Sequence, residues 1–101
     1  MKVLKEGHLY ELDSMEGTNP QTIQFIEKEK IGEKFTTVND GTTNEEVLEM
    51  LIDRTKTLGA KLPSRENSLA LTKLEEALLW FNRRTQNRIK QGVENTPLPH
   101  K

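Results

Sequence analysis

The chain has 101 residues, with 15 Lys and Arg, 16 Asp and Glu, no Cys and a formal net charge of −1. This length predicts one domain, and the absence of Cys excludes disulfides, thiolate zinc sites and Cys nucleophiles. With 33% hydrophobic and 31% charged residues, one protomer is expected to have a thin core that a partner subunit completes.

The first forty residues predict a small antiparallel β-sheet. Three short strands are indicated at residues 8–12, 22–27 and 35–38, which carry β-branched and aromatic side chains. Turn-forming residues separate them, around Gly17 and around Gly32, and the third strand is expected to end at Asn39. Such a sheet is stable only if one of its faces is covered.

The second half predicts two helices folded back on each other. Thr43 and Glu46 form a capping-box pattern at the start of the first helix, which is expected to end at Gly59. Ser64 is the expected N-cap of the second helix, with Gly92 as its stop. The buried stripes are predicted at three- and four-residue steps, and their members are Val47, Leu48, Leu51, Ile52, Thr55, Leu58, Leu71, Leu74, Ala77, Leu78, Phe81 and Ile89.

The predicted fold class is therefore α+β, with a small N-terminal antiparallel sheet followed by a C-terminal αα-hairpin. Residues 1–92 are expected to form one domain, with the sheet in 1–40 and the hairpin in 43–92, and residues 93–101 a disordered tail. Leu69, Leu79 and Trp80 lie outside the stripe of the second helix. One helical partner cannot cover them all, so we expect a dimer or larger assembly.

Catalytic groups are scarce. The chain has two histidines, His8 and His100, and it has no phosphate-binding loop pattern or dinucleotide fingerprint. Glu75 and Glu76 are adjacent on a predicted helix and therefore point in different directions. We expect a protein that is not an enzyme and has no metal and no cofactor.

Cations gather at the end of the second predicted helix, where Arg83, Arg84, Arg88 and Lys90 occur without an acid between them. Arg84 and Arg88 are four residues apart, so both guanidinium groups lie on one face and can bind phosphates bidentately. The alternative is that these cations only complement the C-terminal end of the helix dipole. Arg65 and Asn67, in the first turn of the same helix, form a second candidate anion site.

Charge is distributed unevenly: residues 1–53 hold 12 acids and 5 bases, whereas residues 54–101 hold 4 acids and 10 bases. Such asymmetry points to an anionic ligand or to charge-matched self-association, unless both halves simply have solvated faces.

The run from Trp80 to Arg84 also resembles a homeodomain recognition helix, but its Asn82 lacks the required spacing from the aromatic pair. A DNA-associated regulator using Arg83, Arg84 and Arg88, and a hairpin that only binds a protein partner, remain the alternatives.

No run of about 18 apolar residues is present, and the first residues lack the apolar stretch of a signal peptide. The expected location is the cytoplasm, with no membrane partner.

Three segments of the chain resemble a known family: residues 63–80, residues 39–48 and residues 7–13. The first stretch is similar to the helical-hairpin domain shared by phage anti-CBASS protein 2 and Thoeris anti-defence protein 1. The other two are similar to the Thoeris branch in particular. The resemblance implies a phage protein that acts as a sponge in the bacterial host cytoplasm. Such proteins bind immune signalling nucleotides and withhold them from effectors without cleaving them.

The resemblance also implies ligands and site residues. The resemblance implies that proteins of the Thoeris branch bind cyclic ADP-ribose isomers, and that relatives bind cyclic trinucleotides in a separate pocket. It also implies that the proteins of this family assemble as dimers and hexamers through their helices. The paired arginines of the family fit Arg84 and Arg88, its Asn near the helix start fits Asn67, and Arg65 fits a basic residue that meets phosphate in the anti-CBASS relatives. Duplex nucleic acid is not an expected partner.

Overall fold

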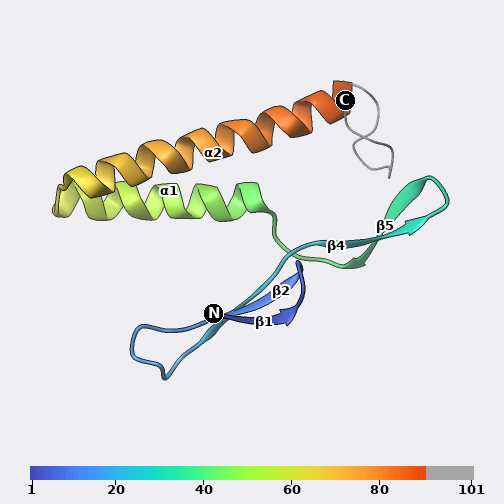
Figure 1. Ribbon diagram of the computed structural model, residues 1–101, viewed down its shortest axis with the longest axis horizontal. Coiled ribbons are helices and arrows are strands. Elements are labelled where there is room, and N and C mark those ends of the chain that lie inside the picture. The colour runs from blue at the N-terminus through green and yellow to red at the C-terminus, as the bar shows by residue number, and fades with distance from the viewer. Residues whose placement is uncertain (91–101) are drawn as a thin grey trace. The chain divides into compact units, whose positions relative to one another are not determined.

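The computed structural model describes residues 1–90. The predicted helix stop at Gly92 and the predicted disordered tail lie outside the described residues. Five strands are followed by two helices, which confirms the α+β class with a helical hairpin after the sheet region (Figure 1). The chain divides between Thr43 and Asn44 into two compact units, the first holding all the strands and the second both helices.

The first unit contains two small antiparallel sheets rather than the one that was predicted. Strands β1 (Lys2–Lys5), β2 (Leu9–Leu12) and β3 (Gln21–Gln24) form a three-stranded sheet in the order β1-β2-β3. Strands β4 (Glu27–Ile31) and β5 (Lys34–Asn39) form a separate two-stranded ribbon.

Two details of the predicted sheet were wrong. The strand expected at 22–27 ends at Gln24, and Glu27 already belongs to β4, so the segment at 35–38 pairs with β4 and not with the first sheet. Strand β2 begins at Leu9, which leaves His8 in the preceding turn. The turn around Gly32 was predicted correctly: Gly32 has φ of 65° at the first central position of a two-residue hairpin loop.

The chain returns to the end of β3 before the first helix begins. Phe25 and Thr42 form an isolated parallel bridge. The Thr42 N–H donates to the Gln24 carbonyl at 2.9 Å, and the Ile26 N–H donates to the Thr42 carbonyl at 2.9 Å. This approach requires glycine at position 41, because a Cβ there would lie 2.4 Å from the Gln24 carbonyl oxygen.

A polar cluster links the two sheets of the first unit. The Glu27 carboxylate at the start of β4 accepts from Lys5 Nζ of β1 at 2.5 Å and from Asn39 Nδ2 of β5 at 2.9 Å. Its side chain is only 14% exposed. These hydrogen bonds favour the charged form, so the pKa of Glu27 is lowered, first by the Lys5 bond and then by the Asn39 bond.

The second unit is an antiparallel pair of helices, α1 (Asn44–Lys61) and α2 (Arg65–Lys90), joined by residues 62–64. Helix α1 starts directly after Thr43, as predicted, but it continues past Gly59 for two residues because Ala60 and Lys61 are good helix formers. Ser64 is the N-cap of α2, since its Oγ accepts from the Asn67 N–H at 3.0 Å.

The core between the helices is thin, as the composition predicted. Within residues 1–90 Ile52 is the one apolar side chain classed as buried, at 9% exposure. Three residues of the predicted stripes are exposed instead: Leu51, Leu58 and Ile89. Leu51 and Leu58 lie on the flank of α1, turned from the line of Leu48, Ile52 and Thr55 that faces α2.

Ile89 is exposed for a different reason. Helix α2 has 26 residues and α1 has 18, so the last eight residues of α2 extend about 12 Å beyond the first residue of α1. Figure 1 shows this free end of α2, which we define as residues 83–90. Ile89 points in the direction of the buried stripe, but no residue of α1 lies opposite it, and it is 57% exposed.

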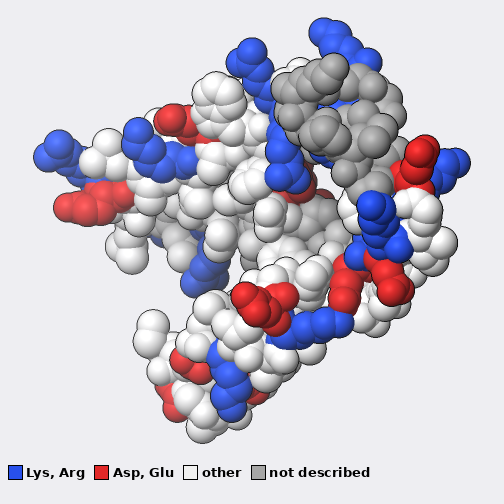
Figure 2. Space-filling model, turned by 45° about the vertical axis from the view of Figure 1, so that its right-hand side comes forward, with Lys and Arg blue, Asp and Glu red and all other residues white. Residues whose placement is uncertain are grey.

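Other large apolar side chains of the hairpin are also exposed, including Leu79 at 63% and Trp80 at 59%. Leu69 belongs to the same group, which confirms that these three lie outside the intramolecular stripe. Figure 2 shows broad uncharged areas between the charged side chains on the surface of the protein. Exposed apolar areas of this kind are typical of interaction surfaces.

Candidate functional site

The free end of α2 carries the first candidate site. Arg83, Arg84, Arg88 and Lys90 all lie on it, so the structure brings the predicted pair Arg84 and Arg88 together on one helix face. Arg84 is exposed and Arg88 is half-buried. Since α1 does not extend alongside these residues, their guanidinium groups are not enclosed by the hairpin.

Each of the first two arginines lies against an aromatic ring one turn earlier. The Cζ of Arg83 lies 5.5 Å from the centre of the Trp80 ring, and the Cζ of Arg84 lies 5.8 Å from the centre of the Phe81 ring. A cation over an aromatic face gains about 0.5–1 kcal/mol at an exposed position. These contacts restrict where the guanidinium planes lie, which favours the binding of a ligand with fixed phosphate positions.

The charge of Arg83 and Arg84 is not neutralised locally. Among the residues that the structure describes, neither guanidinium forms an ion pair with a carboxylate. Carboxylates of residues 1–90 pair instead with lysines and with the N-terminal ammonium group. The guanidinium groups of Arg83 and Arg84 are therefore available to an anion from outside the protomer.

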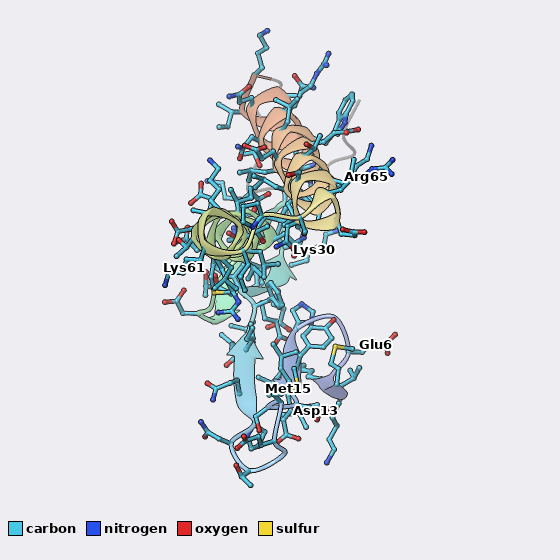
Figure 3. All side chains as sticks on the ribbon, turned by 90° about the vertical axis from the view of Figure 1, so that its left-hand side faces the viewer. Glu6, Asp13, Met15, Lys30, Lys61 and Arg65 are labelled. Carbon is cyan, nitrogen blue, oxygen red and sulfur yellow. The ribbon has the colours of Figure 1, made fainter. Side chains whose placement is uncertain are left out.

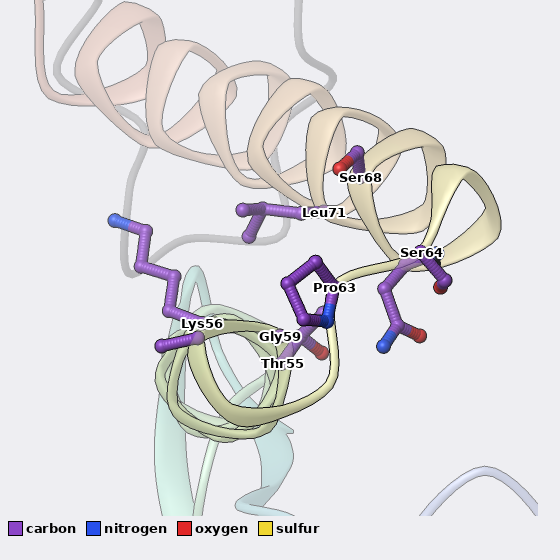
Figure 4. Close-up of a pocket in the computed structure, with 9 residues that line it drawn as sticks. Thr55, Lys56, Gly59, Pro63, Ser64, Ser68 and Leu71 are labelled. Atoms are coloured by element: carbon purple, nitrogen blue, oxygen red, sulfur yellow. Dashed lines mark hydrogen bonds between the residues drawn. The ribbon is translucent and has the colours of Figure 1, made fainter.

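The start of α2 carries the second candidate site. Arg65 is exposed in the first turn and its side chain extends away from the helix (Figure 3). Asn67 is half-buried and is one of the residues that line a hollow of about 220 Å³. Figure 4 shows this hollow beside the connector between the helices. The hollow is lined by Thr55, Lys56, Gly59, Ala60, Pro63, Ser64, Asn67, Ser68 and Leu71.

The hollow is small for a nucleotide. Ligand pockets for molecules of this size hold about 300–1,000 Å³ and bury most of the ligand surface. Its polar side chains are Thr55, Lys56, Ser64, Asn67 and Ser68. The Lys56 Nζ lies 3.8 Å from Glu75 Oε2. Sequence reasoning missed Lys56 and Gly59 as members of this site, because only the antiparallel pairing of the helices places α1 residues beside Asn67.

The structure does not bring the two candidate sites together within one protomer. Arg65 and Arg84 are 19 positions apart on one continuous helix, which corresponds to about 28 Å along its axis. A single small nucleotide cannot touch both. The four predicted site residues therefore form two separate places, Arg65 with Asn67 and Arg84 with Arg88.

Metal binding and proton transfer each need suitably placed side chains within the described residues 1–90. The His8 ring lies in a turn, where its Nδ1 donates to the Glu6 carbonyl at 3.0 Å. Within residues 1–90 no three His, Asp or Glu side chains are grouped so that they could hold a metal ion. No helix in this part of the chain is long and apolar enough to cross a bilayer.

The fold and the candidate sites define a class of hairpin proteins. In this class, small antiparallel sheets are followed by a helical hairpin with a short connector, and the second helix ends in an arginine-rich segment. The family described as Acb2/Tad1, hairpin domain, matches residues 26–86, and the chain belongs to this family. The match covers Arg65, Asn67 and Arg84 and ends before Arg88.

One relative is similar in sequence over part of this chain. It is named Thoeris anti-defense 1, from Bacillus phage SBSphiJ7, and it is 45% identical over 58 residues. These residues are 56% of this chain and 41% of the relative. The matched region thus spans less than half the length of that protein.

Proposed function

We propose that this protein is a phage anti-defence sponge that binds immune signalling nucleotides and sequesters them without cleaving them. Family membership and the relative named Thoeris anti-defense 1 support an anti-defence role. The observation that carries the ligand class is the free end of α2, where Arg84 and Arg88 share one face and Arg84 lies over the Phe81 ring. Two such guanidinium groups suit the pyrophosphate of a cyclic ADP-ribose signal.

The separation of the two candidate sites supports two ligand classes. A cyclic ADP-ribose isomer is assigned to Arg84 and Arg88, and a cyclic oligonucleotide to Arg65 and Asn67. Both places are open in one protomer, and a second copy of the chain provides the missing walls. The proposed assembly is a dimer or a hexamer formed through the helices, for which the exposed Leu69, Leu79 and Trp80 supply apolar surface.

The test is calorimetric titration of the protein against cyclic ADP-ribose isomers and cyclic di- and trinucleotides, with the mass of the assembly measured by light scattering in the same buffer. Tight binding of at least one cyclic ADP-ribose isomer by an oligomer is the expected result. Failure of every nucleotide in the panel to bind would contradict the sponge.

The arginine row of α2 also suits the alternative of a DNA-associated regulator, since the same guanidinium groups can contact duplex phosphates. The salt dependence separates the two functions. Binding to a duplex through many phosphates weakens steeply with ionic strength, whereas two phosphate contacts give a shallow slope. We expect the shallow slope with a cyclic nucleotide and no binding of a duplex oligonucleotide at physiological salt.

A further inference from the structure

Strand β5 has an outer edge whose backbone groups point away from β4. Ile31 and Lys34 flank the two-residue hairpin loop and form a pair, and such a flanking pair exchanges both of its backbone hydrogen bonds. Hydrogen-bonded and non-hydrogen-bonded pairs alternate along an antiparallel ribbon. The N–H and C=O groups of Phe35 and Thr37 therefore point outward. Within residues 1–90, β5 pairs with β4 and with no other strand.

The outer edge of β5 is uncharged and partly apolar. Phe35, Thr36, Thr37 and Val38 follow one another without a charged residue, and Phe35 is 36% and Val38 is 48% exposed. Aromatic and β-branched side chains favour strand pairing, and proteins commonly protect such edges with charges, prolines or bulges. The register shift of the ribbon leaves Val38 as a bulged residue, so the regular edge ends at Thr37.

Two copies of β5 fit each other in one antiparallel register. When Thr36 lies opposite Thr36 of a second copy, Phe35 of each copy lies opposite Thr37 of the other. The outward groups of Phe35 and Thr37 then form the hydrogen-bonded pairs, and the two Thr36 residues form the non-hydrogen-bonded pair between them. Every outward N–H and C=O of these residues thus finds an acceptor or a donor. A Thr–Thr pair across two strands adds to the stability of such a contact.

The charges of the ribbon favour β5 over β4 for this contact. The corresponding register on the outer edge of β4 would place Lys28 opposite Lys30, and Glu29 opposite Glu29 of the second copy. Like charges directly opposite each other destabilise a strand pair. In the β5 register, Lys34 lies opposite the uncharged Val38 of the second copy. The self-complementary edge of the ribbon is therefore that of β5.

We propose that β5 of one protomer pairs with β5 of a second copy, so that two ribbons form one antiparallel sheet in the order β4-β5-β5-β4. The partner is a second copy because this edge is complementary to itself both in backbone hydrogen bonds and in charge. The contact lies in the sheet unit and is distinct from the assembly through the helices. A protomer with two self-complementary contacts joins dimers into larger assemblies.

Cysteine cross-linking tests the contact, since the wild-type chain has no Cys. The Cα atoms of a non-hydrogen-bonded pair lie about 4.5 Å apart, a distance that a disulfide spans. Thr36→Cys in the full-length protein is therefore expected to give a disulfide-linked dimer on a non-reducing gel after mild oxidation at micromolar concentration. Glu29→Cys is the matched control, because Glu29 is the exposed residue opposite Thr36 on β4, and it is expected to stay unlinked.

Two substitutions added to Thr36→Cys test the backbone hydrogen bonds. Thr37→Pro removes an outward N–H and leaves the hydrogen bonds to β4 in place, as proline does at the outer edge of a sheet. Loss of the linked dimer is expected. Thr37→Val is its control, because Val keeps both the N–H and the β-branched shape, and it is expected to link as fully as Thr36→Cys alone.

Amide hydrogen exchange of the wild-type protein tests the same contact without a substitution. Dilution is expected to remove the protection of the Phe35 and Thr37 amides, whereas the Thr36 amide, which faces β4, keeps its protection. Absence of a linked dimer with Thr36→Cys, or equal linking of Thr36→Cys and Glu29→Cys, would overturn the proposal. Protection of Phe35 and Thr37 that does not change with protein concentration would also overturn it, because a different segment would then cover the edge.

Discussion

The guanidinium carbon of Arg84 lies 5.8 Å from the centre of the Phe81 ring, one helical turn earlier on α2. Phe81 is half-buried and belongs to the stripe that faces α1, so its ring is held by the packing of the hairpin. Arg84 is thereby held against a part of the structure that does not depend on the ligand. A preorganised cation loses less conformational entropy when it binds a phosphate than a free one does.

Loss of either paired arginine is expected to weaken ligand binding. A charge-assisted hydrogen bond contributes about 1.5–3 kcal/mol, so Arg84→Ala or Arg88→Ala should lower the affinity for cyclic ADP-ribose by roughly one to two decades. Arg54→Ala on the exposed surface of α1 is the control with the same loss of charge. Calorimetry measures the affinities, and thermal melts are expected to show folded proteins, because Ala is a good helix former. Full affinity in the double variant would contradict this site.

The hairpin was predictable because its signals are local. Ser64 caps α2 through the Asn67 N–H three residues later, and that interaction depends only on neighbouring residues. Strands β1 and β4 were missed for the opposite reason. Residues 27–30 of β4 alternate Glu and Lys without an apolar face. Their strand conformation follows from pairing with β5, which periodicity in one segment does not reveal.

The candidate site was predictable only in part. The spacing of Arg84 and Arg88 already places them on one helix face. The exposure of Ile89 was not predictable, because it depends on how far α2 extends past the start of α1. The contribution of Lys56 and Gly59 to the hollow beside Asn67 likewise requires the register of the two helices.

Gly41→Ala is expected to destabilise the sheet unit. The added Cβ would lie 2.4 Å from the Gln24 carbonyl oxygen and 2.6 Å from the Phe25 carbonyl carbon, and both are backbone atoms that cannot rotate away. A shift of this backbone costs about 1–3 kcal/mol, as overpacking does elsewhere. Gly59→Ala is the matched control: nothing lies within 4 Å of its Cβ position, and Ala in a helix interior gains about 0.5–1 kcal/mol over Gly. Chemical denaturation should therefore give opposite signs, and equal effects would contradict the described approach at Gly41.

Glu27 is expected to make the stability of the first unit depend on pH in the acid range. Its pKa is lowered from 4.5 by the Lys5 and Asn39 hydrogen bonds, so the unfolded chain binds the proton more readily than the folded one. The stabilisation is then complete above the unfolded pKa and is lost as the pH falls through the lower folded pKa.

The measurement is denaturant unfolding of wild type and Glu27→Gln between pH 3 and pH 6. The wild-type free energy of unfolding should fall more steeply below about pH 4.5, and the variant should lose that part of the slope. Glu29→Gln, an exposed carboxylate on the same strand, is the control and is expected to keep it. Parallel pH profiles for wild type and Glu27→Gln would show that the cluster does not stabilise the folded state.

The exposed apolar side chains of α2 are expected to lie in contacts between copies. Leu79 is 63% exposed in one protomer, and burial of a Leu side chain contributes about 1.5–3 kcal/mol. A charge at this position, as in Leu79→Glu, should therefore shift the assembly toward smaller species, while Met15→Glu in an exposed loop of the first unit should not. Light scattering at micromolar concentration gives the mass. A wild-type protein that is monomeric under these conditions would contradict the expected assembly.

A sponge must also return its ligand chemically unchanged. Within residues 1–90 the side chains around Arg84 and Arg88 on α2 are cations, amides, apolar groups and the Thr85 hydroxyl. That stretch of the helix has no His, Asp or Glu to activate the hydroxyl as a nucleophile. Heat denaturation of the complex is therefore expected to release the ligand unchanged. The released molecule should have the same mass as the added ligand and should activate its effector equally well. The control is the free nucleotide heated alone, which corrects for thermal hydrolysis. A hydrolysed product that appears with the wild-type protein, is missing from the control and is lost in Arg84→Ala would show that the site cleaves its ligand, and the sponge function would be wrong.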